Sequence, residues 1–465
     1  MDFGNQRRHL LFQLLPLFFI MIAIVVGTLN FKSIRQFLIG AFGEPARITV
    51  DTQAVLGPTQ YPWRNLAQGG ENKDWRLQPL TSQVRALNTQ YIRLDHIYDF
   101  YDIVHKNGGS LTFDFSKLDP VLKDITSTGA RPFIALSYTP PAIAVNGDIT
   151  APPENWAEWQ LTVQKTIEHI SGTLGITNVY YEVWNEPDLF GGYKTYGSRN
   201  YLDLYRYAAK GDLAARNVQP HRFGGPAITA LYKTWVDNLM QMVTNENLPL
   251  DFFSWHRYST NIDQYRLDIA QVKQWMAPYP RGQNLELDIT EWGHNSNNDP
   301  GYDGNFGAIH TIAVSTELEA NINKAFVFEI QDGKDPAGQI RWGRWGIFDI
   351  NNQPKPRYSA LRFLDKIGPQ RLQLLGKGTW VKGMASKDGD DTTLILANYD
   401  PVGRHSEITP VTFTNIAPGT YQVSQQSFGG GLNNQTVSTT AAQLRINVPM
   451  GANTAMFIRL HQLSR

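Results

Sequence analysis

From about residue 47 onward, short apolar stretches alternate with longer stretches in which apolar residues recur every three or four positions. The short stretches are typical of buried strands, and the longer ones of helices with one apolar face. Strands that alternate with helices indicate a parallel α/β fold. The pattern predicts strands at residues 47–51, 91–95, 131–137, 179–188, 222–228, 251–258, 285–291 and 325–330.

The helical stretches fall between these strands. They are predicted at residues 77–88, 115–126, 153–170, 200–215, 235–243, 262–276, 306–322 and 356–367. Eight strand and helix pairs over about 320 residues fit a TIM (β/α)8 barrel with enlarged loops, which we assign to residues 47–368. The first strand leaves an alternative, because residues 63–66 compete with residues 47–51 for that place.

After Gly368 the pattern changes to short alternating strands separated by turn clusters. Residues 392–398 and 454–460 are examples of the strands, and residues 388–391 of the turns. This pattern predicts an all-β module, a C-terminal β-sandwich, at residues 369–465.

The N-terminal end carries the longest uncharged apolar stretch of the chain, residues 10–29. About 20 such residues span a bilayer, so residues 1–30 are predicted to hold a transmembrane helix that serves as a membrane anchor, with residues 31–46 as a stalk. Arg7 and Arg8 before the span favour an exported body in the periplasm or outside the cell. A cleaved signal segment is the alternative, and the protein would then be secreted.

The amino-acid composition excludes several classes of function. Lys plus Arg equals Asp plus Glu at 42 each, and no basic cluster interleaved with aromatic residues occurs, so no nucleic acid is expected as a partner. The chain has no cysteine, which excludes thiolate metal sites and nucleophilic thiols. Aromatic residues make up 12% of the chain; some of them are candidates for stacking platforms in a sugar cleft.

Two predicted strands end in a glutamate. The apolar run that starts at Val179 stops at Asn185, Glu186 and Pro187, and the run that starts at Leu285 ends at Glu291. Because all strands of such a barrel end on one face, the two carboxyl groups are expected to meet there. Glycoside hydrolysis needs one protonated and one ionised carboxyl group, so this pair is the candidate catalytic pair. The alternative is that one glutamate is only an ion-pair partner of an arginine.

Four more polar residues are expected on this face. Arg93 ends the second strand and is positioned to hydrogen-bond Glu291 and favour its charged form, although a purely structural arginine is the alternative. Asn185 is a candidate for binding a sugar 2-hydroxyl. His256 and Tyr258 end the sixth strand, and Tyr258 is expected to orient Glu291.

No cofactor or metal is predicted. The ten histidines form neither a His-x-x-x-His nor a His-Glu-x-x-His motif. The glycine pairs lack the fingerprint of a dinucleotide or phosphate loop, and no Gly-x-Ser-x-Gly elbow occurs.

Two sequence motifs resemble those of a known enzyme family. Trp184-Asn-Glu-Pro187 and Ile289-Thr-Glu-Trp-Gly293 resemble the acid/base and nucleophile motifs of clan A glycoside hydrolases, and the chain is most similar to family 39. The resemblance implies a retaining barrel enzyme in which Glu186 is the acid/base and Glu291 the nucleophile. Its supporting stretches lie at residues 91–96, 115–119, 131–137, 251–258 and 355–360.

The sugar subsite departs from the family pattern. The family often has a tryptophan on the eighth strand, where this chain has Phe328, so Trp342 or Trp345 in the following loop is the candidate substitute. Trp292, which follows Glu291 in its motif, is a further substrate-binding candidate.

These observations predict a membrane-tethered retaining hydrolase of a polysaccharide or oligosaccharide, endo-acting on exopolysaccharide. An exopolysaccharide synthesis or export machinery is a candidate partner. The alternatives are an exo-acting glycosidase similar to the β-xylosidases of family 39, and a catalytically inactive polysaccharide-binding protein of an export system.

Overall fold

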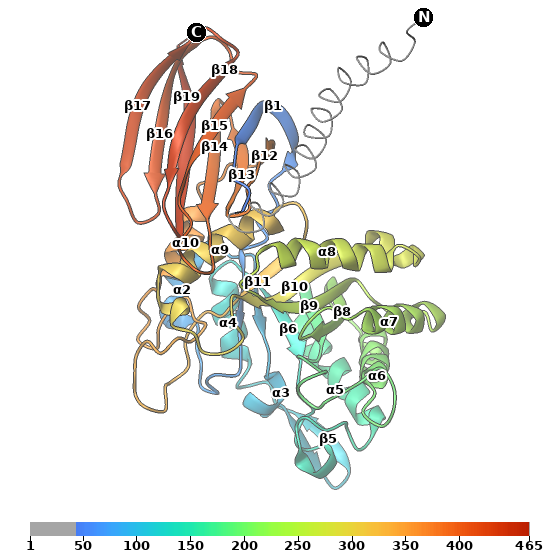
Figure 1. Cartoon of the computed structure of the whole chain (residues 1–465). Helices are drawn as coiled ribbons and strands as arrows, with labels where there is room; N and C mark the ends of the chain where they lie inside the picture. Colours follow the sequence, from blue (N-terminus) through green and yellow to red (C-terminus); the bar gives the residue numbers. More distant parts are fainter. Residues whose placement is uncertain (1–42, 465) are drawn as a thin grey trace, which may run out of the picture.

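The computed structural model describes residues 43–464. It consists of a barrel surrounded by helices and, next to it, a large β-sheet that contains the C-terminal strands (Figure 1). Within residues 43–464, no helix is both long enough and apolar enough to cross a membrane. The anchor predicted at residues 10–29 lies outside the described residues and stays a prediction.

The barrel is closed, and all of its strand pairs are parallel, as predicted. Each strand is buried along most of its length, as expected for a sheet covered on both faces. In order around the barrel the strands are β2 (Asn65–Gln68), β3 (Tyr91–Leu94), β6 (Arg131–Leu136), β7 (Val179–Val183), β8 (His221–Ile228), β9 (Phe252–Tyr258), β10 (Glu286–Gly293) and β11 (Lys324–Phe328).

The helices follow their strands as the periodicity predicts, except for the short α3 (Ile97–Phe100), which the periodicity did not indicate. They are α2 (Thr81–Arg85), α3 (Ile97–Phe100), α4 (Asp119–Ser127), α5 (Trp156–Ile167), α6 (Tyr201–Ala214), α7 (Lys233–Asn245), α8 (Asp263–Met276), α9 (Asn305–Leu318) and α10 (Pro356–Leu364). A short hairpin of β4 (Val104–Asn107) and β5 (Ser110–Phe113), which the periodicity did not indicate, precedes α4.

The preferred first barrel strand was wrong, and its competitor was right. Residues 47–51 belong to β1 (Ile48–Pro58), which pairs with two strands of the C-terminal sheet, whereas β2 overlaps residues 63–66. The reason lies in the burial pattern. β1 buries Ile48 and Val50 but leaves Thr49 and Asp51 partly exposed, which suits a sheet with one open face. β2 is buried at every position.

The C-terminal module is confirmed as a β structure. Its strands join β1 in one hydrogen-bonded sheet of nine strands, in the order β17-β16-β19-β14-β13-β12-β1-β15-β18. The remaining strands are β12 (Gln370–Leu375), β13 (Val381–Asp388), β14 (Asp391–Asn398), β15 (Glu407–Thr414), β16 (Gly419–Ser427), β17 (Leu432–Thr439), β18 (Gln443–Met450) and β19 (Thr454–Ser464).

Helix α9 lies between the barrel and this sheet (Figure 1). From Gly307 to Leu318 every one of its residues is buried, because one side of the helix faces the barrel and the other contacts β13 and β14. A helix buried on all sides needs no polar face, and the hydroxyl groups of Thr311, Ser315 and Thr316 donate to carbonyl groups of the helix itself. The ring of Tyr399, just after β14, packs against Phe306 and His310 of this segment.

Aromatic side chains fill the interior of the barrel. The ring of Phe133 stacks on Tyr180, with 5.2 Å between centroids, and contacts Phe252 and Phe326 at 5.3 Å and 4.7 Å. A barrel filled in this way is a packed core and not a channel. Open space for a ligand is therefore found at the mouth, where the loops after the strands begin.

Candidate active site

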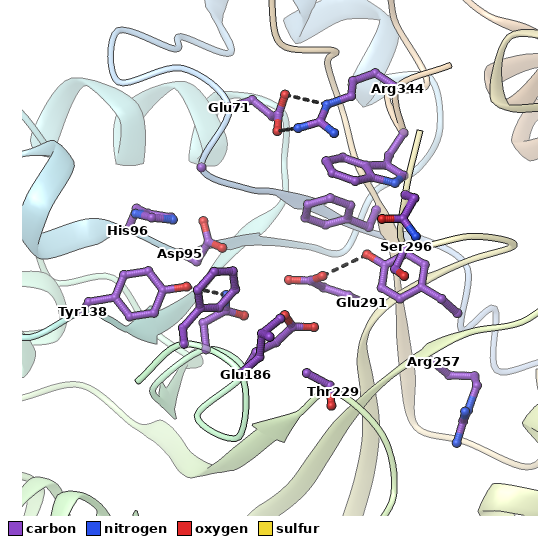
Figure 2. A pocket seen from close by; sticks show the side chains of 18 residues that line it. Glu71, Asp95, His96, Tyr138, Glu186, Thr229, Arg257, Glu291, Ser296 and Arg344 are labelled. Atoms are coloured by element: carbon purple, nitrogen blue, oxygen red, sulfur yellow. Dashed lines mark hydrogen bonds and ion pairs between the residues drawn. The ribbon is translucent and has the colours of Figure 1, made fainter. Parts of the chain in front are cut away.

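A cavity of about 660 Å³ opens at the C-terminal ends of the barrel strands (Figure 2). This volume lies within the range of small-molecule sites. All eight strands, or the loops that follow them, contribute to its wall. The lining residues are Gly70, Glu71, Asp95, His96, Tyr138, Asn185, Glu186, Leu189, Phe190, Thr229, Arg257, Tyr258, Glu291, Ser296, Asn297, Phe328, Arg344 and Trp345.

A tight turn after β7 positions Glu186. Trp184 and Glu186 both have left-handed backbones, with φ of 75° and 45°. The backbone N–H of Glu186 donates to Ala227 O of the neighbouring β8 at 2.9 Å, and Trp184 itself is fully buried. Such conformations cost roughly 1–3 kcal/mol each and persist where the surroundings enforce them. The turn therefore directs the Glu186 side chain into the cavity.

A bulge in β10 positions Glu291. The pairing of β10 with β9 shifts register between Ile289 and Glu291, and Glu291 then pairs with His256. Bulges re-aim side chains and are frequent beside functional sites. The next residue, Trp292, consequently faces the opposite side of the strand.

Arg93 joins the two glutamate-bearing strands. Its side chain is fully buried and donates three hydrogen bonds: from Nε to Glu182 Oε2 at 2.7 Å, from Nη1 to Glu291 Oε1 at 2.9 Å, and from Nη2 to Asn185 Oδ1 at 2.8 Å. The predicted bond to Glu291 is therefore present. Burial disfavours the charge on Arg93, but the Glu182 and Glu291 carboxylates outweigh it and raise its pKa above the usual value.

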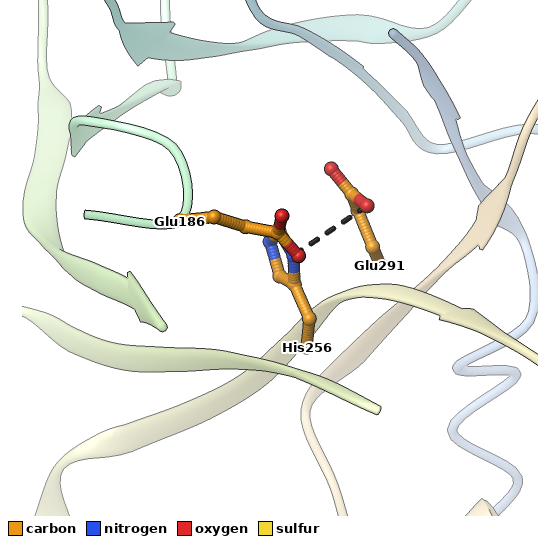
Figure 3. A group of neighbouring side chains, drawn as sticks. All are labelled: Glu186, His256 and Glu291. Atoms are coloured by element: carbon orange, nitrogen blue, oxygen red, sulfur yellow. Dashed lines mark hydrogen bonds and ion pairs between the residues drawn. The ribbon is translucent and has the colours of Figure 1, made fainter. Parts of the chain in front are cut away.

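Two residues of β9 complete the surroundings of Glu291. Tyr258 donates from its phenol to Glu291 Oε2 at 2.9 Å, as predicted. Burial raises the pKa of this phenol, so it keeps the proton that it donates. His256 Nδ1 lies 2.9 Å from Glu186 Oε1 and 3.4 Å from Glu291 Oε2, between the two carboxyl groups (Figure 3).

The two carboxyl groups are close. One oxygen of Glu186, one oxygen of Glu291 and a ring nitrogen of His256 all lie within 4.8 Å of one another. Burial raises the pKa of Glu291 to about 7, and the Glu186 charge adds to the rise, whereas His256 and Arg93 oppose it. Burial would lower the pKa of His256, but the Glu291 and Glu186 carboxylates raise it above its usual value. The pair therefore retains one proton near neutral pH.

These three side chains are also the group of potential metal ligands found among residues 43–464. Chemically, two carboxylates and an imidazole suit a divalent ion. However, His256 Nδ1 is at hydrogen-bonding distance from both carboxyl groups, and a nitrogen that donates a proton has no lone pair for a metal. The geometry therefore suits a hydrogen-bonded acid pair better than a metal site.

The predicted aromatic residues divide into two groups. Phe328 and Trp345 line the cavity, with 5.3 Å between their ring centroids. Trp342 lies outside the cavity lining, and its indole N–H donates to Gly333 O at 3.2 Å. Trp292 was wrong as a substrate-binding candidate, because its fully buried ring packs against Tyr265 and His310 behind the strand.

The sequence did not single out several cavity residues. Asp95 and His96 follow β3, and Tyr138 follows β6, where its hydroxyl accepts a hydrogen bond from Asn185 Nδ2 at 2.9 Å. Glu71 and Arg344 form an ion pair at one side of the cavity (Figure 2). Their position directly after predicted strands, or in the long loop after the eighth, was the available signal.

Comparison of the sequence with known proteins gives a family match. The model of the family described as glycosyl hydrolases family 39 matches residues 46–400. A protein of Caldicellulosiruptor saccharolyticus named beta-xylosidase is 29% identical over 411 residues, which cover 80% of this chain and 81% of that protein. A beta-xylosidase of Geobacillus stearothermophilus is 24% identical over 298 residues, or 56% of this chain and 57% of that protein.

Solved structures show the same fold. A monomeric beta-xylosidase from Caulobacter crescentus CB15 superposes with a TM-score of 0.74 at 20% identity, over 90% of this chain and 100% of that structure. The family 39 enzyme from Xanthomonas axonopodis pv. citri gives a TM-score of 0.73 at 20% identity, over 90% of this chain and 98% of the other.

The contacts of Arg93 lead to a prediction about stability. Arg93→Lys is expected to lower the free energy of unfolding by about 3–5 kcal/mol. The ammonium group of lysine lacks the planar fork by which the guanidinium reaches its three acceptors, so Glu182 would remain buried without its partner. Denaturant unfolding followed by tryptophan fluorescence measures the loss.

Arg206→Lys is the matched control. Arg206 also makes a two-bond contact with a glutamate, Glu246, but at the surface, so a change of only about 0–1 kcal/mol is expected. Equal losses in the two variants would contradict the central role of the buried contacts.

Proposed function

The chain belongs to glycosyl hydrolase family 39 and is a retaining glycoside hydrolase; from this premise we propose that it cuts an exopolysaccharide internally, outside the cytoplasm. The observation that carries the chemistry is the close pair of Glu186 and Glu291 in the cavity. Retaining enzymes hold their carboxyl groups about 5–5.5 Å apart, whereas inverting ones separate them by about 6.5–9.5 Å.

In the proposed mechanism, Glu291 attacks the anomeric carbon while the bond to the leaving oxygen breaks. Arg93, Tyr258 and His256 place positive charge or hydrogen-bond donors at its two oxygens, which favours the ionised form that a nucleophile needs. The product of this step is a glycosyl ester of Glu291.

Glu186 supplies the proton in the first step and removes one in the second. Its hydrogen-bonding partner is His256, whereas Glu291 is contacted by Arg93, Tyr258 and His256. In this mechanism the proton that the carboxyl pair shares passes to the leaving oxygen through Glu186. Once the leaving group has departed, Glu186 takes a proton from the water that hydrolyses the ester.

Asn185 keeps hydrogen-bonding capacity for the sugar. Its Oδ1 accepts from Arg93 and its Nδ2 donates to Tyr138, and each atom can make one bond more. We assign the second N–H of Nδ2 to the sugar 2-hydroxyl, where a hydrogen bond can strengthen in the transition state.

Endo action is supported by the apolar side of the cavity. Leu189 and Phe190, on the turn that carries Glu186, line the cavity with 60% and 39% of their surfaces exposed. Tyr196, further along the same loop, is 66% exposed. Exposed apolar side chains beside a site suit ligand binding, and aromatic ones suit the apolar faces of further sugar rings.

An exo-acting glycosidase is the second candidate function, and the opposite side of the cavity favours it. There Arg344 is hydrogen-bonded to Glu71, donates to Asn298 Oδ1 at 2.6 Å, and stacks at 3.7 Å from the Trp345 ring. Three loops are joined in this way, and they restrict the room for a long chain. The two curated relatives are named beta-xylosidase, which agrees with this candidate.

The location outside the cytoplasm rests on residues 10–29. Their length and lack of charge suit a membrane anchor, which would hold the barrel next to the machinery that makes or exports the polymer. The alternative of an inactive binding protein is not retained, because the chain belongs to a family of glycosidases and has both carboxyl groups in place.

Substitution of Glu291 and of Glu186 is expected to affect turnover differently. Glu291→Gln should abolish turnover of every glycoside, because an amide does not form the ester. Glu186→Gln should lose roughly 10²–10⁴-fold on polymer but less on aryl glycosides, whose phenolate leaves without a proton. Added azide should restore turnover of aryl glycosides by Glu186→Gln, since azide attacks the ester without a base.

Initial rates and product analysis measure these effects, and circular dichroism checks folding. Glu246→Gln at the surface is the control and should behave like wild type. Normal hydrolysis by Glu291→Gln would overturn its assignment as the nucleophile.

The pH profile of kcat/KM is expected to be bell-shaped, with its alkaline limb near pH 7. Burial raises the pKa of Glu291 to about 7, so above this pH the carboxyl pair loses the proton that the leaving oxygen needs. At lower pH a second proton neutralises the nucleophile. Initial rates on an aryl glycoside give the profile, and a rate unchanged up to pH 9 would contradict it.

The products distinguish endo from exo action. Endo action is expected to lower the viscosity of an extracted bacterial exopolysaccharide early and to release oligosaccharides of several sizes. Exo action on a plant xylan or its oligosaccharides would instead release one sugar at a time. If an aryl xyloside is hydrolysed faster than any polymer, the second candidate replaces the first.

A further inference from the structure

One buried carboxyl group in the cavity lacks a partner. Asp95 follows β3, two residues after Arg93, and only 7% of its surface is exposed. Its Oδ1 is fully buried without a hydrogen bond, and no described residue donates to its other oxygen. It lines the cavity between His96 and Glu291 (Figure 2).

Such an arrangement is costly for the folded protein. Buried polar groups are nearly always hydrogen-bonded, and a buried charge without a donor costs several kcal/mol or stays protonated. Burial raises the pKa of Asp95, although the charges of His96 and Arg93 oppose the rise. Neither neighbour donates to Asp95: His96 Nδ1 lies 2.9 Å from Asp99 Oδ2, and Arg93 has its own three acceptors.

Among residues 43–464, the other acids with a buried oxygen that lacks a hydrogen bond are Asp99, Glu182, Asp288, Asp303, Glu319 and Glu329, and none of them lines the cavity. Two examples show the difference. Asp288 is enclosed within the barrel, where the charge of Lys324 faces it. Glu329 accepts hydrogen bonds from Gln68 Nε2 and Gly69 N through one oxygen. Neither lines the cavity, so Asp95 is distinguished by an open side on which a ligand can supply the missing donor.

We propose that Asp95 determines sugar specificity by accepting a hydrogen bond from a donor group on the ring held against Glu291. The donor is a hydroxyl group or a protonated amine, at a ring position other than the anomeric carbon. This inference rests on the proposed hydrolysis at Glu291. A charged acceptor makes a stronger hydrogen bond than a neutral one, so a ring without a donor at this position is rejected.

The same carboxyl group excludes acidic sugars. The carboxyl groups of Glu71, Asp95, Glu186 and Glu291 line the cavity. The nearby cations of Arg344, Arg257 and His96 are already paired with Glu71, Asp268 and Asp99. A sugar carboxylate next to Asp95 would meet like charge without a free cation. Neutral sugars and amino sugars are therefore accepted and uronic acids disfavoured.

The test compares wild type with Asp95→Asn, which keeps the shape and removes the charge. On the best neutral aryl glycoside, kcat/KM should fall roughly ten- to a hundred-fold. Monodeoxy versions of that glycoside identify the hydroxyl. On the deoxy glycoside that lacks the bound hydroxyl, kcat/KM of wild type should fall by a similar factor. On the same glycoside, kcat/KM of Asp95→Asn should be little lower than its own value on the parent glycoside.

An aminated aryl glycoside distinguishes an amine from a hydroxyl as the hydrogen-bond donor, and an aryl uronide tests the exclusion of acidic sugars. If the amine is the natural donor, the aminated glycoside should be the best wild-type substrate and should show the largest loss in Asp95→Asn. The uronide should gain in the variant relative to wild type. Asp102→Asn, at an exposed carboxylate after the same strand, is the matched control and should leave every rate unchanged.

Thermal unfolding separates this role from a structural one. Because Asp95→Asn removes a buried charge without a partner, Tm should stay constant or rise, whereas loss of a structural contact would lower it. An unchanged kcat/KM on all glycosides, or an equal fall on deoxy and parent glycosides, would overturn the proposal. If wild type hydrolyses no glycoside at all, the proposed function fails instead.

Discussion

The buried guanidinium of Arg93 is the interaction on which the site depends. It links β3 to β7 and β10 through Glu182, Asn185 and Glu291, and all of these groups are shielded from water. Burying a cation costs several kcal/mol, which is offset only when the surrounding acceptors have good geometry. The planar fork of arginine meets this demand with three bonds. The orientation of Glu291 is thereby fixed by the core of the barrel and not by its loops.

The charge on Arg93 also explains how two carboxyl groups stay close together. The charges of Arg93 and His256 oppose the rise in the pKa of Glu291 that burial and the Glu186 and Asp95 charges cause, so the carboxyl pair keeps a single proton near neutral pH. Glu182 is closed off from the cavity, so it balances Arg93 without competing for substrate. The odd proton is left with the pair that faces the sugar, which is the state in which a retaining glycosidase starts.

The barrel could be predicted from the sequence because buried strands and amphipathic helices have different periods. The first strand was misplaced because Arg47–Asp51 and Trp63–Leu66 are both short and partly apolar, and only their partners tell them apart. Glu186, Glu291 and Arg93 could be found because each lies at the end of a strand. Trp292 was wrong because a strand alternates its faces. Asp95 was missed because the lack of a hydrogen-bond partner is a property of the folded chain alone.

The two sides of the cavity differ in a way that bears on the substrate. Next to Glu186 the wall includes exposed Leu189 and Phe190, whose apolar surfaces do not distinguish one hydroxyl pattern from another. Near Trp345 on the other side, Glu71 and Arg344 form an ion pair, and Asp95 lies between His96 and Glu291. Polar groups with fixed directions distinguish between sugars more strongly than apolar contacts do, because a sugar without the matching group leaves them buried and without a partner. The proposed function therefore assigns recognition of the sugar to the polar groups around Glu291, and contact with the rest of a polymer to Leu189 and Phe190.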